Sequence, residues 1–260
     1  MANDEFDRLI GLIKEKNELK GISSEVVRDT LNLYLLKNNI DLGKLSQKDK
    51  EVIKKDIRAE LRKYVGRFHL IHKGEVEKMQ EEDFLEIITK HSSTRERLES
   101  YELLKSFIEE IAPRKIIDLG CGLNPLMIAK KGMEYYAVDI NKSDLEIVGR
   151  YFSLKKIEGH IINKDIRKIT EINLPAADLC LILKVFDVIE SRGHRLAETV
   201  LDEVNTKNLI ISFPTKTLSG RPMNHPQRGW IERLLARKGW PFELHKSKNE
   251  IFYIVKKLKE

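Results

Sequence analysis

The chain has 260 residues and a formal net charge of +6, from 47 Lys and Arg residues against 41 Asp and Glu residues. No apolar run approaches the roughly 18 residues that a membrane-spanning helix needs, and the polar N-terminus has no signal-peptide pattern. The only cysteines are Cys121 and Cys180, which excludes a disulfide-rich secreted scaffold. We therefore expect a reduced, cytoplasmic, globular protein.

The basic excess lies entirely in the last part of the chain. Residues 160–260 contain 18 basic and 12 acidic groups, whereas the basic and acidic groups before them are equal in number. A basic excess favours a polyanionic partner, nucleic acid above all. The alternative is a surface that is simply soluble and mildly basic.

Residues 1–90 predict a small helical domain that docks on RNA or the ribosome, and residues 91–260 predict a catalytic domain. Apolar residues recur at helical spacing from Glu5 onward, and again after Ser23 or Ser24 and after Ser46, each of which can cap a helix. Glycines separate these segments. A further helix is expected over Thr94–Ile111, leading into the first strand.

After residue 113, strand-like and helix-like segments alternate, which predicts a doubly wound α/β sheet. We expect strands over 115–119, 134–138, 159–163, 177–183, 207–213, 241–246 and 250–256, and helices over 125–131, 142–152, 194–203 and 227–238. Only a few polar residues separate the last two strands, so these are expected to form an antiparallel hairpin at the sheet edge.

A glycine turn follows the first strand in the segment Asp118-Leu-Gly-Cys-Gly-Leu-Asn-Pro125. Gly120 and Gly122 can adopt positive φ and leave no Cβ in the path of a ligand. Dinucleotide enzymes use similar turns, but here Pro125 replaces the third glycine of their fingerprint. We assign Gly120, Gly122 and Asn124 to a cofactor loop. Asp118 either serves that loop or a cofactor ammonium group, or is a strand-end turn residue.

Two acids follow the next two strands. Asp139 ends the second strand about 20 residues downstream, where an acid can bind a ribose diol. Asp165 follows the third strand, where it either accepts from an adenine amino group or forms an ordinary turn. This order fits S-adenosylmethionine better than NAD. The sequence therefore predicts a class I S-adenosylmethionine-dependent methyltransferase, with a Rossmann-like seven-stranded sheet and an N-terminal helical domain.

The stretch His91-Ser-Ser-Thr-Arg-Glu-Arg-Leu98 places Arg95 and Arg97 near a helix start, where the helix dipole does not favour cations. Either arginine can clamp the methionine carboxylate in a bidentate pair, or the segment is an ordinary helix start.

The end of the fourth strand, Leu181-Ile-Leu-Lys-Val-Phe-Asp187, is where many methyltransferases hold the target base. It lacks the Asn-Pro-Pro-Tyr type of motif found in amino-methylating enzymes, and Cys180 lies at the wrong end of the strand for a nucleophile. A ring nitrogen such as guanine N7 needs alignment and little proton chemistry. Lys184 can hydrogen-bond guanine O6 or hold phosphate, and Phe186 can stack on a flipped base. The alternatives are a solvated lysine and a core phenylalanine.

The segment Ile211-Ser-Phe-Pro-Thr-Lys-Thr-Leu-Ser-Gly-Arg221 opens a basic loop on the same side of the sheet. Lys216, Arg221 and Arg228, together with His225, can bind RNA phosphates. The alternative is a flexible cationic connection.

Four of these stretches together resemble the aminoglycoside-resistance 16S rRNA methyltransferase family (the Arm/Rmt/Kgm group), which methylates guanine N7 at the ribosomal decoding site. They are His91–Leu98, Asp118–Pro125, Leu183-Lys184 and Ile211–Arg221, and the end of the chain, Ile254-Val-Lys-Lys257, is also similar. The resemblance covers roughly residues 85–257. Residues before these match in size and helical character only, and their even charge departs from the basic face that docking on rRNA favours.

The resemblance implies that S-adenosylmethionine is the cofactor and that 16S rRNA in the small ribosomal subunit is the partner. It implies that Arg97 holds the methionine carboxylate, that Gly120 lies under the cofactor, and that Asp139 and Asp165 bind ribose and adenine. Neither a metal nor a membrane is implied. Lys54, Lys55, Arg58, Arg62 and Lys63 could share one cationic surface of the helical part.

Three other functions remain open from the sequence. The same chemistry could act on tRNA or on another rRNA position. The chain could also be a non-catalytic RNA-binding assembly factor, which the intact cofactor motifs argue against. A methyltransferase for proteins or small molecules is disfavoured by the basic loop and the helical domain.

Overall fold

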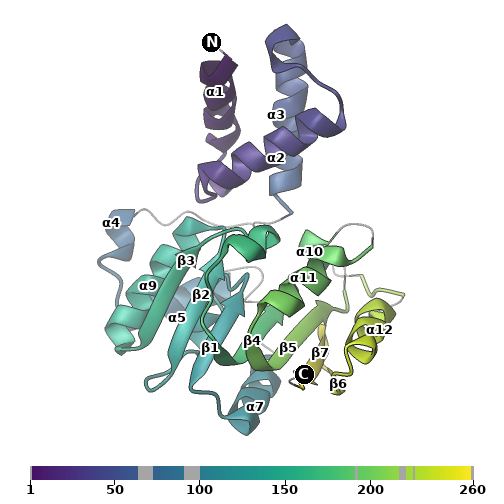
Figure 1. Cartoon of the computed structure of the whole chain (residues 1–260). Coiled ribbons are helices and arrows are strands. Elements are labelled where there is room, and N and C mark those ends of the chain that lie inside the picture. The colour runs from purple at the N-terminus through teal and green to yellow at the C-terminus, as the bar shows by residue number, and fades with distance from the viewer. Residues whose placement is uncertain are drawn as a thin grey trace.

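The computed structural model describes residues 2–63, 73–90, 100–190, 193–216, 221–224 and 226–258. The N-terminal part is a bundle of three helices, α1 (Ala2–Lys14), α2 (Ser24–Lys37) and α3 (Gln47–Leu61), with short 3-10 turns η1 (Asn17–Leu19) and η2 (Leu42–Lys44) between them (Figure 1). Ser23 caps α2 by accepting from the Val26 amide, and Ser46 forms a capping box with Asp49. The predicted serine caps are therefore confirmed at Ser23 and Ser46.

A seven-stranded sheet forms the rest of the fold, in the order β3-β2-β1-β4-β5-β7-β6. Its strands are β1 (Lys115–Leu119), β2 (Glu134–Asp139), β3 (Glu158–Asn163), β4 (Ala177–Leu183), β5 (Thr206–Pro214), β6 (Phe242–Lys246) and β7 (Glu250–Lys256). Strands β1 to β5 are parallel, and β7 runs antiparallel to both β5 and β6. Both the sheet and its antiparallel hairpin follow the sequence prediction.

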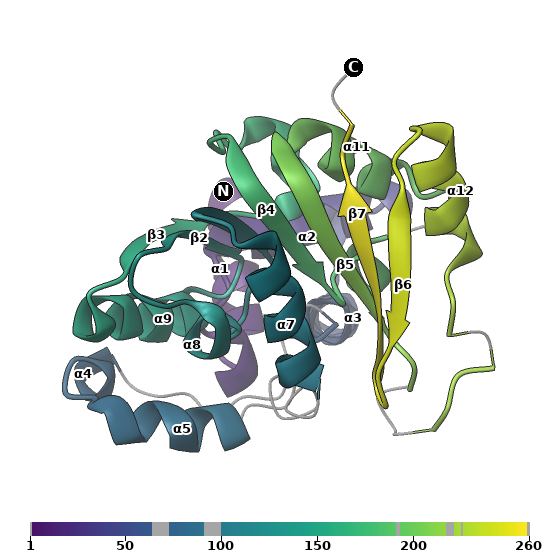
Figure 2. The same cartoon turned by 90° about the horizontal axis from the view of Figure 1, so that it is seen from below.

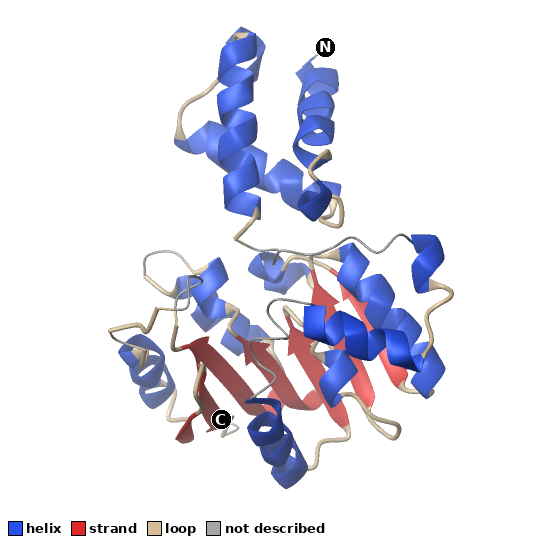
Figure 3. Cartoon of the chain, turned by 180° about the vertical axis from the view of Figure 1, so that it is seen from behind, coloured by secondary structure: helices blue, strands red, loops and turns tan. Residues whose placement is uncertain are grey.

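Helices cover both faces of the sheet (Figures 2 and 3). One face carries α4 (Lys73–Val76), α5 (Glu81–Lys90), α7 (Tyr101–Ile111), α8 (Pro125–Ile128) and α9 (Lys142–Lys155). The other carries η4 (Ile166–Glu171), α10 (Phe186–Ile189), α11 (Arg195–Glu203) and α12 (Gly229–Arg237). Within the residues that the structure describes, no helix combines the length and apolar character needed to cross a membrane.

Residues 73–90 belong by packing to the sheet and not to the N-terminal bundle. Phe84 and Ile88 are buried in the same apolar cluster as β1 and α9, and the Arg150 guanidinium donates to the Met79 carbonyl. Residues 73–90 therefore pack with the sheet, and the domain boundary at residue 90 stays a prediction.

The N-terminal bundle lies over the carboxyl ends of the parallel strands (Figure 1). Ile22 forms an isolated antiparallel bridge with Asn141, just after β2 ends, and Ile140 packs on the core of the bundle. Lys168 of η4 pairs with Asp29 of α2. In open α/β sheets ligands bind at this edge of the strands, so the bundle sits beside the expected site.

Candidate active site

The glycine loop after β1 is held tightly against the sheet. Gly120 and Gly122 have φ values of +67° and +48°, which favour glycine. The amides of Gly120 and Cys121 both donate to the Val138 carbonyl, at 2.8 and 3.1 Å. A Cβ on Gly120 would lie 2.7 Å from Cγ2 of Val185, so the loop also packs against the end of β4 without room for a side chain.

Asp139 joins the end of β2 to this loop. Its Oδ2 accepts from the Gly122 amide and its Oδ1 from the Asn141 amide, both at 2.8 Å. Burial, and secondarily the charge of Asp144, raise the pKa of Asp139 to about 6. Asp139 is a partly exposed residue at the edge of the loop, which is the place predicted for a ribose acceptor.

Asp118 and Asn124 lie beneath the loop in a buried polar layer. The Tyr135 hydroxyl donates to Asp118 Oδ2 at 2.8 Å, and the Tyr101 hydroxyl donates to Asn124 Oδ1 at 2.9 Å. Both Asp118 and Asn124 are almost fully buried. The bonds that these two side chains make link the loop to β2 and α7, so a supporting role is the simpler interpretation of both.

Neither cysteine is suited to be a nucleophile. Cys121 and Cys180 are both buried, and burial raises the pKa of each thiol well above its ordinary value. Covalent catalysis through a thiolate, as carbon methylation of a pyrimidine requires, is thus disfavoured at both positions.

Asp165 starts η4 and is already engaged by its own turn. Its carboxylate accepts from the Arg167 amide at 2.9 Å and pairs with the Arg167 guanidinium at 2.6 Å. These contacts match the turn-former alternative, and they leave adenine recognition by Asp165 a prediction.

Lys184 follows β4 in the left-handed region, with a φ of +60°. Its amide donates to the Ser212 carbonyl at 3.0 Å, and its ammonium lies 3.6 Å from Oε2 of Glu250. Two residues on, Phe186 is fully buried and packs on Phe213 and Trp230 with ring centroids 6.5 and 6.0 Å away. Phe186 therefore has the environment of a core residue, and we do not assign a flipped base to it.

The three cations predicted to contact RNA differ in their surroundings. Lys216 forms an isolated antiparallel bridge with Pro222, the residue after Arg221. Arg228 instead makes a bidentate pair with Asp187, and its guanidinium stacks over Phe213 at 5.4 Å. Arg228 thus links α10 to the start of α12 through its pair with Asp187.

Several predicted residues lie outside the described ranges. Arg97, which the resemblance assigns to the methionine carboxylate, is among them, and so are Ser93, Thr94, Arg95 and His225. Their roles stay predictions.

The sequence alone did not point to Ser212 and Glu250 as site residues. Both side chains are fully buried, and the Ser212 hydroxyl donates to Glu250 Oε1. They lie 38 residues apart, so no local pattern reveals the pair. The only signals were a polar residue in the apolar segment Ile211-Ser-Phe213 and an acid at the start of the last strand.

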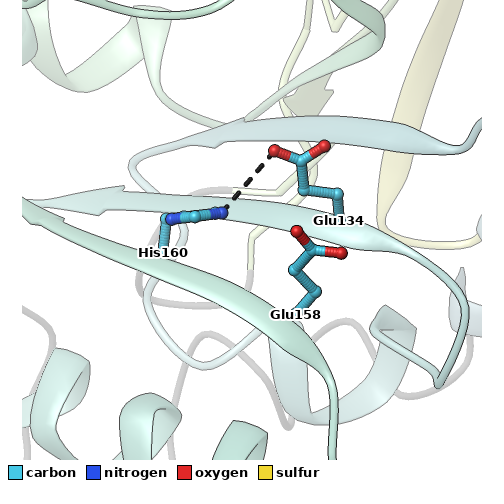
Figure 4. Close-up of side chains that lie close together, drawn as sticks. All are labelled: Glu134, Glu158 and His160. Atoms are coloured by element: carbon cyan, nitrogen blue, oxygen red, sulfur yellow. Dashed lines mark ion pairs between the residues drawn. The ribbon is translucent and has the colours of Figure 1, made fainter.

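Glu134, Glu158 and His160 form a cluster at the amino ends of β2 and β3, opposite the glycine loop (Figure 4). Their ligand-type atoms lie within 4.8 Å of one another. However, the Lys115 ammonium already pairs with Glu134 at 2.9 Å, and the Tyr136 hydroxyl donates to Glu134 at 2.6 Å. The cluster is thereby explained as a partly exposed ion pair, and we assign no metal to it.

Comparison with known proteins identifies the family. A family model described as ribosomal RNA methyltransferase (FmrO) matches residues 69–254. The chain belongs to this family. The match covers the sheet and the helices that pack on it, and it leaves out the whole N-terminal bundle, whose last helix ends at Leu61.

Individual relatives agree with this assignment. Two proteins named 16S rRNA (guanine(1405)-N(7))-methyltransferase are each 29% identical to this chain. The one from Frankia casuarinae matches 64% of this chain and 61% of its own length, and the one from Serratia marcescens matches 67% and 70%. The chain thus spans less than two thirds of the Frankia relative.

Solved structures show the same fold over nearly the whole chain. The 16S rRNA methylase RmtB has a TM-score of 0.75 at 21% identity, covering 97% of this chain and 98% of its own. RmtF, solved in complex with S-adenosyl-L-homocysteine, has a TM-score of 0.75 at 20% identity, covering 98% and 99%. These likenesses extend over the N-terminal bundle, which the family model leaves out.

Proposed function

We propose that this protein transfers the methyl group of S-adenosylmethionine to N7 of a guanine in 16S rRNA of the small ribosomal subunit. The observation that carries the proposal is the junction of Asp139 with the glycine loop. A carboxylate that holds the Gly122 amide at the carboxyl edge of a parallel sheet is placed to accept ribose hydroxyls. Such a substrate is found in the cytoplasm, where we place the enzyme.

The residues present fit that cofactor. Gly120 and Gly122 let the backbone approach a ligand closely, Asp139 provides the ribose acceptor, and Asp165 stands after β3 near the expected adenine position. When bound, S-adenosylmethionine supplies an electrophilic methyl group. Arg97 would hold its carboxylate by the family resemblance.

The site suits a nucleophile that arrives with its lone pair free. Guanine N7 is not protonated at neutral pH, so its methylation needs alignment and no general base. Among the described groups at this edge, the Cys121 thiol is buried, and the Lys184 ammonium is a donor placed where the target base is expected. A donor at this place can orient a guanine, which is what N7 transfer requires.

The N-terminal bundle supplies a surface for the RNA. A groove of about 470 Å³ in the bundle is lined mainly by cations. They are Lys16, Lys48, Lys54, Lys55, Arg58 and Arg62, and the two remaining lining residues are Glu51 and Val52. Four of the five cations proposed from the sequence to share a surface therefore do so, and Lys63 is not among the lining residues. The even charge of residues 1–85 hides this local concentration of basic groups, which suits a phosphate backbone.

The proposal is tested by methyl transfer from labelled S-adenosylmethionine to purified small subunits, bare 16S rRNA and tRNA, followed by mapping of the modified base. A single N7-methylguanine in 16S rRNA of assembled subunits is the expected result. Label confined to tRNA would mean that tRNA is the substrate. Label at another rRNA position would keep rRNA as the substrate and change the target nucleotide. Cofactor binding without label on any RNA would exclude RNA as the substrate.

A further inference from the structure

Three side chains converge where β4, β5 and β7 meet beside the glycine loop. Lys184 follows β4, Ser212 lies on β5 opposite Leu183, and Glu250 begins β7 opposite Pro214. The Ser212 hydroxyl donates to Oε1 of Glu250, and Oε2 of Glu250 lies 3.6 Å from the Lys184 ammonium. Glu250 and Ser212 are fully buried, whereas the Lys184 side chain keeps 14% of its surface exposed.

The backbone fixes both ends of this ion pair. The Lys184 amide donates to the hydroxyl as well as the carbonyl of Ser212, at 3.1 and 3.0 Å, which secures its left-handed conformation. A left-handed non-glycine residue costs free energy and persists only where its surroundings enforce it. At the other end, the Ser247 amide donates to the Glu250 carbonyl at 2.8 Å.

Lys184 is also tied to the cofactor loop. The next residue, Val185, packs so closely on Gly120 that a Cβ there would lie 2.7 Å from Val185 Cγ2. The partly exposed ammonium therefore stands at a fixed place relative to the glycine loop, with a buried carboxylate behind it. A buried carboxylate costs free energy unless it is paired and hydrogen-bonded, and here it is both.

We infer that Glu250 is a positioning residue that holds and electrically balances the Lys184 ammonium while that ammonium donates to O6 of the target guanine. The inference rests on the proposed function. A buried Lys–Glu pair is poor evidence for stability by itself, because apolar residues of the same size often serve a fold as well. Its place beside the glycine loop is what points to a role in the reaction.

The reaction explains why the charge of the Lys184 ammonium needs to be balanced. The lone pair of N7 forms the bond to the methyl carbon as the carbon–sulfur bond breaks, and its electrons stay on sulfur. The positive charge thereby moves from sulfur to the purine ring, and no proton leaves in this step. An ammonium without a counter-ion beside O6 would repel the positive charge that develops on the purine ring and so raise the barrier. With Glu250 behind it, Lys184 keeps its donor and presents almost no net charge.

The test compares Glu250→Asp with Glu250→Gln in methyl transfer to small subunits. If Glu250 acts by charge, the order of kcat is wild type, then Asp, then Gln, with Gln lower by about tenfold or more and KM changed far less. If Glu250 only fills space, Gln, its isostere, exceeds Asp. Melting temperatures and S-adenosylmethionine affinity are measured on each variant, and both substitutions are expected to leave the affinity unchanged.

Glu134→Gln is the matched control, because it also removes the carboxylate of a Lys–Glu pair but at the opposite edge of the sheet. The inference is overturned if Gln exceeds Asp in kcat, or if the loss appears in KM alone. If Glu250→Gln does not fold, Lys184→Ala decides instead, since a stable variant with wild-type kcat would leave the ammonium that Glu250 holds without a role in the reaction. Failure of the proposed function looks different, because the wild type itself would then leave guanine N7 unmodified.

Discussion

The backbone amide of Lys142 donates a hydrogen bond to the carbonyl oxygen of Gly21 at 2.8 Å, which joins the N-terminal bundle to the first turn of α9. The residue before Lys142, Asn141, donates its own amide to Asp139 and bridges to Ile22. The short segment from Asp139 to Lys142 therefore contains both the expected ribose acceptor and the residues that contact the N-terminal bundle. Movement of the bundle and occupation of the cofactor site should consequently affect each other.

The first prediction concerns Gly21→Val. A Cβ on Gly21 would lie 2.3 Å from Oδ1 of Asn141 and 2.7 Å from Oγ of Ser143, so a valine there must displace either the Asn141 cap of α9 or the bundle itself. We expect weaker S-adenosylmethionine binding and a more extended particle in small-angle scattering, with the helical content kept. Gly11→Ala is the control, since nothing lies within 4 Å of its Cβ. If Gly21→Val keeps the wild-type affinity and shape, the position of the bundle does not affect cofactor binding.

The second prediction concerns pH. Because burial raises the pKa of Asp139 to about 6 from its ordinary value of 3.8, protonation favours the folded state. The stability that this proton contributes is complete below about 3.8 and is lost as the pH rises through 6. Cofactor affinity runs the opposite way, since ribose hydroxyls donate to the ionised carboxylate. We expect affinity to fall below pH 6, by up to about tenfold per pH unit.

Titration calorimetry between pH 5 and 8 checks this expectation. Asp139→Asn should bind more weakly, by about 1–3 kcal/mol at pH 7.5, and should show no dependence on pH in this range. If the affinity of the wild type stays constant down to pH 5, Asp139 does not bind the ribose. The same conclusion follows if the variant keeps the wild-type profile.

The sequence was sufficient for the sheet because most of the parallel strands are short apolar runs bounded by polar or turn-forming residues, and β1 and β2 end at a glycine turn and at an acid. Asp118-Leu-Gly-Cys-Gly identified the glycine loop, and its spacing to Asp139 located the acid that holds that loop. The expected helix over 125–131 is shorter, ending at Ile128. Local patterns thus predicted the glycine loop and the acid that holds it, because these residues lie close together in the sequence or at a known spacing.

Contacts between distant residues could not be predicted in this way. Arg228 had the sequence context of a phosphate-binding loop, yet its guanidinium finds Asp187, which is 41 residues away. Phe186 stands where a base could stack, yet β5 and α12 bury it. In both cases the basic or aromatic character was evident from the sequence, but the partner depends on how the strands and helices are assembled.

The third prediction separates a structural cation from an RNA contact. Arg228→Ala removes a mostly buried bidentate pair with Asp187. We expect it to lower the free energy of unfolding by about 1–3 kcal/mol in urea titrations. Lys216→Ala, on the same side of the sheet, should change stability by less than about 0.5 kcal/mol and weaken RNA binding. Equal stability of the two variants would mean that the pair of Arg228 with Asp187 contributes little to folding, and an RNA-binding role of Arg228 would stay open.

The fourth prediction concerns the cationic groove of the N-terminal bundle. Lys48 and Lys55 line it and are exposed, whereas Lys54 and Arg62 already pair with Glu51 and Glu18. A phosphate backbone that binds there releases counterions, so affinity falls with salt in proportion to the number of cations engaged. Lys48→Ala/Lys55→Ala should weaken binding to small subunits and lower the slope of log affinity against log salt by about 2.

Cofactor affinity should not change in this double variant, because the groove is lined only by residues of the N-terminal bundle. Lys44→Ala is the matched control, as Lys44 is an exposed cation of the same bundle that does not line the groove. An unchanged salt slope would mean that the groove does not meet RNA. A slope lowered equally by Lys44→Ala would instead indicate a diffuse effect of net charge, with phosphates attracted to the whole bundle and not seated in this groove.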